Sequence, residues 1–200
     1  WKLYKGQISI RFVYLMIYLI DHEDSFTYNL AHLLDSIEPT IVSNYYEINY
    51  KKLRKASTIV LSPGPGEPKD YPLTSEVYKK YKGKKKILGI CLGFQHIVHS
   101  EGGKIVQQKN ILHGYQSRIK IISDKSIFNK NLDLLGGRYH SLKLEEPFIS
   151  KSMTITMRCA KTNVAMAIED DINQVYGFQF HPDSFLTPNG KYLIKKIISR

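Results

Sequence analysis

Residues 89–94 read Gly-Ile-Cys-Leu-Gly-Phe and carry the clearest chemistry in the chain. Cys91 has one glycine two positions before it and another two positions after it, follows the apolar pair Ile87-Leu88, and precedes a helix-like segment. This layout is typical of a nucleophile elbow, in which a tight and strained turn presents the reactive side chain. The N-terminus of the following helix would favour the thiolate over the thiol. The same pattern also fits an ordinary tight turn with a buried cysteine.

A histidine and a carboxylate far along the chain could complete a catalytic group with Cys91. Residues 175–184 read Val-Tyr-Gly-Phe-Gln-Phe-His-Pro-Asp-Ser. His181 would take and return a proton, while Asp183 would orient the ring and stabilise the imidazolium. His140, in the motif Gly-Arg-Tyr-His-Ser-Leu of residues 137–142, is a competing base, and the chemistry alone assigns a role neither to it nor to Ser141.

The remaining histidines show no mutual spacing suited to a metal, so they are interpreted as surface or packing residues and no metal site is expected: His22, His32, His96, His99 and His113.

A loop rich in proline and glycine follows another predicted strand. Residues 62–66 read Ser-Pro-Gly-Pro-Gly. Proline fixes φ, and glycine lets the backbone approach a ligand closely, so the loop could present N–H groups to an oxyanion. A simple Pro/Gly turn is the alternative. A phosphate-binding P-loop is excluded because no Gly-Lys-Ser/Thr follows.

The elements that must position these residues alternate in the first half of the chain. Strands are predicted over residues 16–21, 40–45, 57–61 and 86–90, and helices over 25–37 (with Asp24 as N-cap), 51–56, 74–81 and 94–100. Short strands are predicted over 104–108, 117–122, 139–144, 153–159, 164–169 and 175–180, before a last helix over 191–199. The pattern predicts an α/β fold with an open, mostly parallel central sheet, helices on both faces, and mixed or antiparallel strands added in the second half. Ligands bind such sheets beyond the carboxyl ends of the strands, where Cys91 is expected.

Composition limits the classes of protein that fit. The 200 residues are 42% hydrophobic, which suits one domain, placed at residues 16–200, with 1–15 as an N-terminal extension. Two cysteines without metal spacing suit a reducing compartment, and we expect a cytoplasmic location. The longest apolar run, residues 12–20, is about half of a bilayer span, so no membrane association is expected. The net charge of +11 raises a nucleic-acid hypothesis, but scattered lysines without aromatic platforms favour a solvated basic surface.

Taken together, the motifs resemble the class I glutamine amidotransferases, which have a flavodoxin-like sheet. The resemblance runs from about Met16 to the C-terminus, and is strongest to the small subunits (component II) of anthranilate synthase and of aminodeoxychorismate (para-aminobenzoate) synthase. It rests on the elbow, the Ser-Pro-Gly-Pro-Gly loop, the Gly-Phe-Gln-Phe-His-Pro-Asp-Ser motif, Asp21-x-x-Asp-Ser-Phe-Thr-Tyr-Asn-Leu30, His113-Gly114 and Arg138-Tyr-His-Ser-Leu142. The Asp-Ser-Phe-Thr-Tyr-Asn opening and the Arg-Tyr-His-Ser-Leu segment favour the chorismate-enzyme branch.

The resemblance implies a role for each matching residue. Cys91 would attack the side-chain amide of L-glutamine, with His181 and Asp183 completing the triad. Backbone N–H groups of Gly66 and Leu92 would hold the oxyanion. The glutamine pocket would be lined by Gly64, Pro65, Gly66, Gln95, Ser141 and Leu142. No cofactor is expected in this subunit. Ammonia would pass to a large, chorismate-binding subunit (component I), which is expected to need Mg²⁺ and to dock over the Cys91 cleft, with rim lysines taking part.

Two departures from the family pattern stand out. The family usually has glutamate where this chain has Asp183, whose side chain is shorter by about 1.5 Å. Residues 113–117 read His-Gly-Tyr-Gln-Ser, although Lys-Thr is common in the middle of this motif. A stand-alone γ-glutamyl hydrolase, or a partner-regulatory homologue with the same fold, is kept as the alternative function.

Overall fold

A computed structural model describes residues 15–108 and 113–200, and the N-terminal extension predicted over 1–15 lies outside these ranges apart from its last residue. The strands in chain order are β1 (Ile17–Asp21), β2 (Thr40–Asn44), β3 (Thr58–Leu61), β4 (Lys86–Ile90), β5 (Ile105–Gln107), β6 (Tyr115–Ile121), β7 (Leu134–Arg138), β8 (Leu142–Leu144), β9 (Thr154–Cys159), β10 (Ala165–Asp170) and β11 (Val175–Phe178). The helices are α1 (Thr27–Asp35), α2 (Tyr50–Lys55), the 3₁₀ turn η1 (Pro68–Asp70), α3 (Pro72–Tyr81), α4 (Leu92–Ser100) and α5 (Gly190–Ile198).

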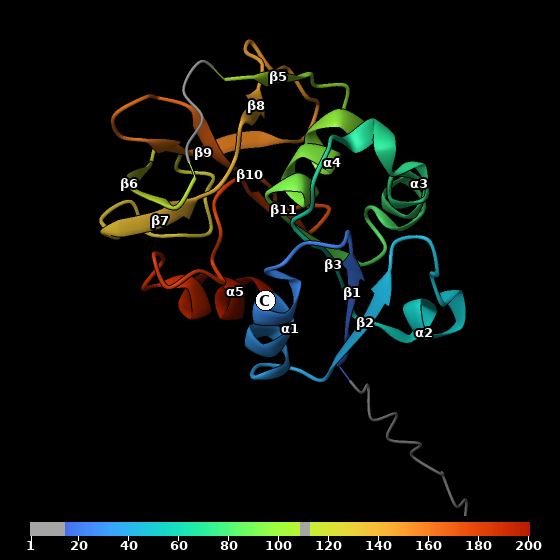
Figure 1. The fold of residues 1–200 in the computed structure, drawn as a ribbon. Coiled ribbons are helices and arrows are strands. Elements are labelled where there is room, and N and C mark those ends of the chain that lie inside the picture. Colours follow the sequence, from blue (N-terminus) through green and yellow to red (C-terminus); the bar gives the residue numbers. More distant parts are fainter. Residues whose placement is uncertain (1–14, 109–112) are drawn as a thin grey trace, which may run out of the picture.

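One nine-stranded sheet forms the centre of the molecule, in the order β2-β1-β3-β4-β11-β10-β9-β6-β7 (Figure 1). The pairings from β2 to β11 are parallel, and those from β11 to β7 are antiparallel. The short strands β5 and β8 pair separately. The predicted α/β fold with antiparallel strands added in the second half is thus confirmed.

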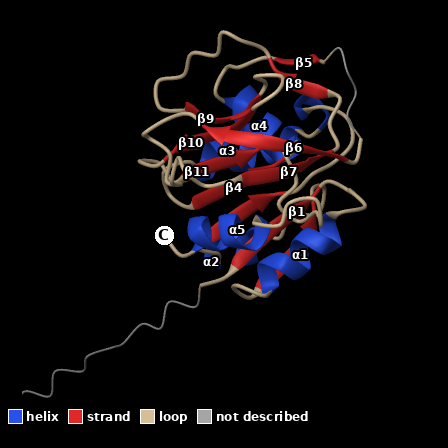
Figure 2. Ribbon diagram, turned by 90° about the vertical axis from the view of Figure 1, so that its left-hand side faces the viewer, coloured by secondary structure: helices blue, strands red, loops and turns tan. Residues whose placement is uncertain are grey.

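Alternation along the parallel strands divides the core in two. In β1, Ile17 and Leu19 pack toward α1 and α5, whereas Tyr18 and Ile20 pack toward α2, α3 and α4. All four side chains are fully buried, which requires helices on both faces of the sheet. Figure 2 shows α1 and α5 on the near side of the sheet, with α3 and α4 behind it.

The predicted strand over residues 139–144 is wrong in its first half. A strand that the sequence did not predict, β7, ends at Arg138, and only Leu142–Leu144 is extended and paired afterwards. β7 belongs to the large sheet through β6, whereas β8 belongs to the small sheet through β5. The three residues between them are therefore the crossing from one sheet to the other.

The predicted N-cap of α1 is also wrong. The helix begins at Thr27, and its N-cap is Phe26, which makes no side-chain capping bond. The Asp24 carboxylate accepts a hydrogen bond from the Phe26 N–H at 2.7 Å and so stabilises a turn before the helix. No helix in the described part of the chain is long and apolar enough to cross a membrane.

Candidate active site

Cys91 occupies a strained turn between β4 and α4. Its backbone has φ 52° and ψ −100°, outside the regions that side chains usually adopt, so the predicted strain is confirmed. A Cβ on Gly89 would lie 2.4 Å from the Gly93 backbone, and a Cβ on Gly93 would lie 2.2 Å from the Leu61 oxygen. Both glycines are needed because strand, turn and helix pass within backbone contact of one another.

His181 is brought to Cys91 by the pairing of β4 with β11. Phe178 pairs with Ile90, and the Cys91 N–H donates to the Phe178 oxygen at 2.7 Å, so the two strands end side by side. Beyond β11, the His181 N–H donates to the Gly137 oxygen at 2.9 Å. The Thr187 hydroxyl donates to the His181 oxygen at 2.6 Å. These bonds fix the backbone of His181, whose side chain is almost fully buried.

Asp183 lies beside His181 but does not hydrogen-bond to it. The distance from His181 Nδ1 to Asp183 Oδ1 is 3.6 Å, which is longer than a hydrogen bond. The Asp183 side chain is fully buried, and neither of its oxygens has a hydrogen-bond partner among the described residues. The pair is therefore an ion-pair contact across a small gap, with a carboxylate whose hydrogen-bonding capacity is unused.

The charges around His181 favour its protonated form. Burial opposes the positive charge, but the Cys91 sulfur and the Asp183 carboxylate outweigh this effect and raise the pKa of His181 from 6.5 to about 10. The aromatic rings of Phe26 and Tyr139 flank the imidazole, with centroids 5.5 and 5.0 Å away. At neutral pH the site therefore contains a proton donor in an enclosed position.

The loop of residues 62–66 packs directly on the elbow. A Cβ on Gly64 would lie 2.6 Å from Leu92 Cδ2 and 2.6 Å from His22 Cβ, so the loop backbone touches both residues. Gly66 has φ +72°, where a side chain is unfavourable. The Tyr71 hydroxyl donates to the Pro65 oxygen at 2.8 Å. The loop is thus held beside the first residue of α4, whose N–H lies in the turn without helical acceptors.

His22 holds the first residue of this loop, Ser62, through hydrogen bonds. Its N–H donates to Ser62 Oγ at 2.9 Å, and its Nδ1 lies 3.2 Å from the Ser62 oxygen. Its Nε2 lies 2.9 Å from the Thr74 hydroxyl. Burial lowers the pKa of His22 to about 4 and that of the stacked His96 to about 3, so both rings are neutral. Their interpretation as packing residues is confirmed by their complete burial.

The residues predicted to bind glutamine lie around this centre. Gln95 is buried in the first turns of α4, and its N–H donates to the Cys91 oxygen. Ser141 and Leu142 are half-buried and follow Tyr139, the residue that contacts His181. The Ser141 oxygen accepts from the Gln108 N–H at 2.8 Å, which fixes this segment to the small sheet.

Sequence reasoning assigned no role to Gln179, which the structure places beside the nucleophile. Gln179 is fully buried, and its Nε2 lies 3.8 Å from Cys91 Sγ. Its Oε1 accepts from Gln95 at 3.4 Å. The available signal was its position two residues before His181, since alternate residues of an extended segment share a face.

His140, the competing base, has both ring nitrogens engaged. Arg138 Nε donates to His140 Nε2 at 3.0 Å, and His140 Nδ1 donates to the Leu142 oxygen at 2.7 Å. Burial and the Arg138 charge lower the pKa of His140 to about 3. A neutral imidazole with no free nitrogen positions the segment and does not accept protons. Between the two histidines, the geometry favours His181 as the base.

The described residues offer no set of ligands for a metal ion. Over residues 15–108 and 113–200, no group of three or more His, Cys, Asp or Glu side chains could hold a metal ion. A cavity of about 1090 Å³ lies on the other side of Arg138, and Cys91 is not among the residues that line it.

The chain matches the family model described as "Glutamine amidotransferase class-I" over residues 18–199. It is 36% identical over 187 residues to anthranilate synthase component 2 of Lactococcus lactis, covering 92% of this chain and 94% of that protein. It is 35% identical over 188 residues to the aminodeoxychorismate/anthranilate synthase component 2 of Bacillus subtilis, covering 92% and 95%. Among solved structures, a glutamine amidotransferase from Thermotoga maritima superimposes with a TM-score of 0.73 at 16% identity, over 94% of this chain and 97% of that one, and shows the same fold.

Proposed function

The chain belongs to the class I glutamine amidotransferase family, and from this premise we propose that it releases ammonia from L-glutamine for a chorismate-using synthase. The observation that carries the proposal is the meeting of Cys91 and His181 at the adjoining ends of β4 and β11. A strained nucleophile beside a protonated histidine is the arrangement that acyl transfer through a thioester requires.

In the proposed reaction, Cys91 Sγ attacks the side-chain amide carbon of glutamine. The negative charge on the amide oxygen is held by the N–H groups of Gly66 and Leu92, from the loop and from the first turn of α4. His181, which is protonated at neutral pH, gives its proton to the departing nitrogen, and ammonia leaves. A γ-glutamyl thioester remains on Cys91.

Water completes the turnover. His181 is neutral after giving up its proton, so it can accept one from a water molecule that attacks the thioester carbon. The Cys91–carbonyl bond breaks, glutamate leaves, and His181 is again protonated beside the sulfur. Across the 3.6 Å gap, the Asp183 carboxylate would stabilise the protonated ring before ammonia leaves and again after glutamate leaves. In this proposal the half-reaction uses only groups of this chain, without a cofactor, and Mg²⁺ serves the partner.

Glutamine is proposed to lie between the loop and the crossing segment. Gly64, Pro65 and Gly66 would line one side. Gln95, Ser141 and Leu142 would line the other, in positions fixed by the bonds to Cys91, Gln108 and His140. Gln179 would contact the reacting sulfur through its amide.

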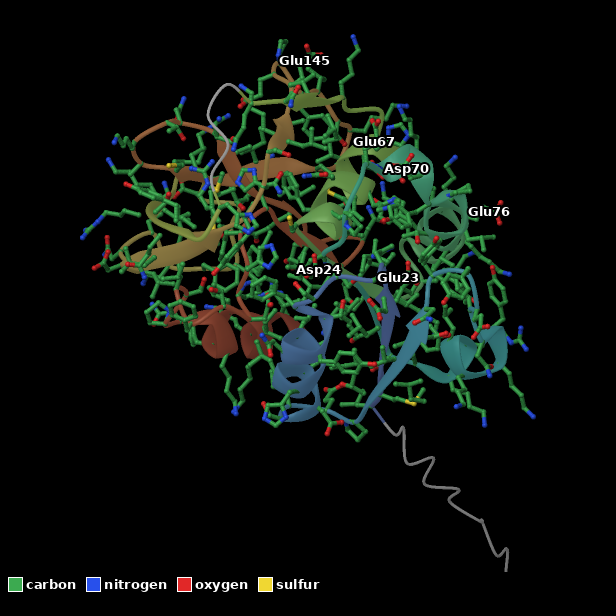
Figure 3. The ribbon with its side chains drawn as sticks, viewed as in Figure 1. Glu23, Asp24, Glu67, Asp70, Glu76 and Glu145 are labelled. Carbon is green, nitrogen blue, oxygen red and sulfur yellow. The ribbon has the colours of Figure 1, made fainter. Side chains whose placement is uncertain are left out.

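The partner is proposed to be a larger, chorismate-binding subunit, because the similar proteins of L. lactis and B. subtilis are both named as component 2. It would cover the carboxyl edge of the parallel strands. Figure 3 shows acidic side chains around this edge, from the loops after β1 (Glu23 and Asp24) and β3 (Glu67 and Asp70). In a chain of charge +11, this acidic rim favours a partner with basic groups, although Glu67 is paired with Lys69 at 2.6 Å. The contact through rim lysines stays a separate prediction.

The large subunit determines which product is made from chorismate and therefore which pathway the pair serves. We propose anthranilate as the product. The B. subtilis relative bears both names, which favours testing aminodeoxychorismate as well. The experiment is glutamine-dependent amination of chorismate by this chain mixed with either kind of large subunit. Product that is lost in Cys91→Ala and restored by ammonium salts would support the proposal and identify the partner. Without product from either mixture, while ammonium salts still drive both large subunits, a stand-alone γ-glutamyl hydrolase becomes the better assignment.

A further inference from the structure

A cavity of about 1090 Å³ opens between the small sheet and the antiparallel half of the large one. In Figure 1, β5 and β8 lie above β6 and β9, and these strands supply much of its wall. It is distinct from the Cys91 site, and its lining combines basic and apolar side chains. Those used below are Arg138, Lys143, Lys161, Val106, Leu144 and Val164.

Arg138 is a buried cation without a carboxylate partner. Its side chain is 1% exposed, and within the described residues it forms no salt bridge. Its three hydrogen bonds go to groups other than carboxylates: His140 Nε2 at 3.0 Å, Gln108 Oε1 at 3.4 Å and Cys159 Sγ at 3.5 Å. Buried charges are normally paired, and a guanidinium is shaped to bind a carboxylate through two parallel bonds.

The other charged groups at the cavity leave its electrostatic field positive. Lys143 and Lys161 line it, and neither forms a salt bridge with a described residue. Of the acidic residues there, Glu146 is engaged by both terminal nitrogens of Arg158, and Glu145 is exposed and lies 3.8 Å from Lys104. Arg118 is already paired with Asp133 at 3.2 Å. An anion entering the cavity would therefore meet Arg138 and two free lysines.

The walls suit an apolar body attached to that anion. Val106, Leu144 and Val164 line the cavity, and its volume is at the upper end for small-molecule sites. We propose that this cavity binds a small organic carboxylate, with its carboxylate on the Arg138 guanidinium and its apolar part against these side chains. A simple inorganic anion would use only the charged part of the site.

The cavity is linked to the Cys91 site through the crossing segment. Arg138 and Tyr139 are consecutive, yet Arg138 lines the cavity while the Tyr139 ring contacts His181. Arg138 also holds His140, which in turn bonds the Leu142 oxygen. A carboxylate that drew Arg138 away from His140 would release this restraint on Leu142. On the proposed function, the ligand would then change the KM for glutamine more than kcat.

Cys159 provides a readout that does not depend on activity. It lines the same cavity, and the chain has only one other cysteine. Burial opposes ionisation of its thiol, but hydrogen bonds from Thr162 and Lys161 and the Arg138 charge outweigh this and lower the pKa of Cys159. In Cys91→Ser, iodoacetamide can therefore report on the cavity alone.

The test compares benzoate with its neutral analogue benzamide. Saturable protection of Cys159 from alkylation by benzoate, with benzamide weaker by about tenfold or more, is the expected result. The double variant Lys143→Gln/Lys161→Gln should weaken benzoate about threefold to tenfold, and a folded Arg138→Gln should abolish protection. Equal protection by benzamide, or no saturable protection by benzoate, would overturn the proposal. Neither result depends on whether glutamine is hydrolysed.

The folding of Arg138→Gln is checked by circular dichroism, and the surface double variant keeps the test decisive if Arg138→Gln does not fold. Inorganic phosphate at matched ionic strength separates recognition of charge alone from recognition of an organic acid. Protection by phosphate equal to that by benzoate would overturn the part of the proposal that assigns the apolar walls to the ligand.

Discussion

His181 Nδ1 and Asp183 Oδ1 are 3.6 Å apart, and both side chains are buried, so an ion pair sits in the protein interior without a hydrogen bond. A buried carboxylate usually accepts two or more hydrogen bonds, and Asp183 has none among the described residues. The gap is about what one further methylene would fill. In the proposed triad, Asp183 therefore offers His181 an opposite charge but no hydrogen bond to orient the ring.

Asp183→Glu is expected to close this gap and to raise glutaminase turnover by about tenfold, because a hydrogen-bonded base is held in one orientation. The measurement is steady-state glutamate release with the partner present. Asp183→Asn is the control of matched size, and it should lower turnover because it removes the charge. A decrease in Asp183→Glu would mean that the surroundings are fitted to aspartate.

The raised pKa of His181 predicts a titration near pH 10. Because the folded-state value lies above the unfolded one, the protonated ring stabilises the fold fully below about pH 6.5, and this contribution is lost as the pH rises through 10. Cys91→Ala should lower the midpoint, since the Cys91 side chain is one of the groups that raise the pKa of His181. Histidine side-chain NMR would measure it, with Cys159→Ala as the control that leaves it unchanged.

Substitution at the elbow should be far more costly than at another glycine. Gly93→Ala would place a Cβ 2.2 Å from the Leu61 oxygen and is expected to cost about 3 kcal/mol or more. Gly102 has φ +84° with no atom near its added Cβ, so Gly102→Ala should cost about 1 kcal/mol. Urea unfolding compares the two variants. If both variants lost the same free energy of unfolding, contact with β3 would not be the reason for a glycine at position 93.

Neutral buried histidines should make the fold sensitive to mild acid. The pKa values of about 4 for His22 and about 3 for His96 and His140 lie below the unfolded value. Stability is therefore present above pH 6.5 and lost as the pH falls, by about 2 kcal/mol for each ring between pH 7 and 5. His96→Leu should remove the part of this pH-dependent loss of stability that comes from one ring. Both His96 nitrogens are buried without partners among the described residues, so no hydrogen bond is lost with them. Urea unfolding at pH 7, 6 and 5 tests this, with the exposed His99→Gln as control.

Charge reversal on the acidic rim should weaken assembly with the large subunit. Glu23→Lys and Glu67→Lys are expected to reduce affinity several-fold at low salt, with a smaller effect at high salt, because exposed charges are screened. Asp124→Lys, in the loop after β6, is the matched control. Tighter binding of the rim variants would point to an acidic partner surface.

The nucleophile elbow and the parallel strands were predictable because their signals are local. The glycines around Cys91 predict the tight turn, and the apolar runs of β1, β3 and β4 predict buried strands, each from a few neighbouring residues. β7 was missed because it contains Gly136 and Gly137, residues that strands usually avoid. The structure explains them, since a Cβ would lie 2.4 Å from Ile119 Cδ1 at Gly136 and 2.9 Å from Ser184 Oγ at Gly137. Such close approaches between distant segments leave no local pattern.

The position of Gln179 and the gap at Asp183 were hidden for the same reason. Asp183 was recognised as one methylene short, but only the buried geometry shows that the shortfall is not recovered by a shift of the backbone. The acid-sensitive pair His22 and His96 is 74 residues apart in sequence and meets only through the packing of α4 against the loop after β1.

The pairing of β4 with β11 also governs how the protein must be made. β4 and β11 are neighbours in the sheet, yet every strand from β5 to β10 is synthesised between them. Until β11 emerges, the backbone N–H and C=O groups along one edge of the apolar strand β4 have no partner. Chains associate wrongly on such unpaired edges. Forming a contact of such sequence separation is slow. The two strand ends that carry Cys91 and His181 therefore join late in folding, and a chaperone that shields β4 during synthesis should raise the yield of active protein.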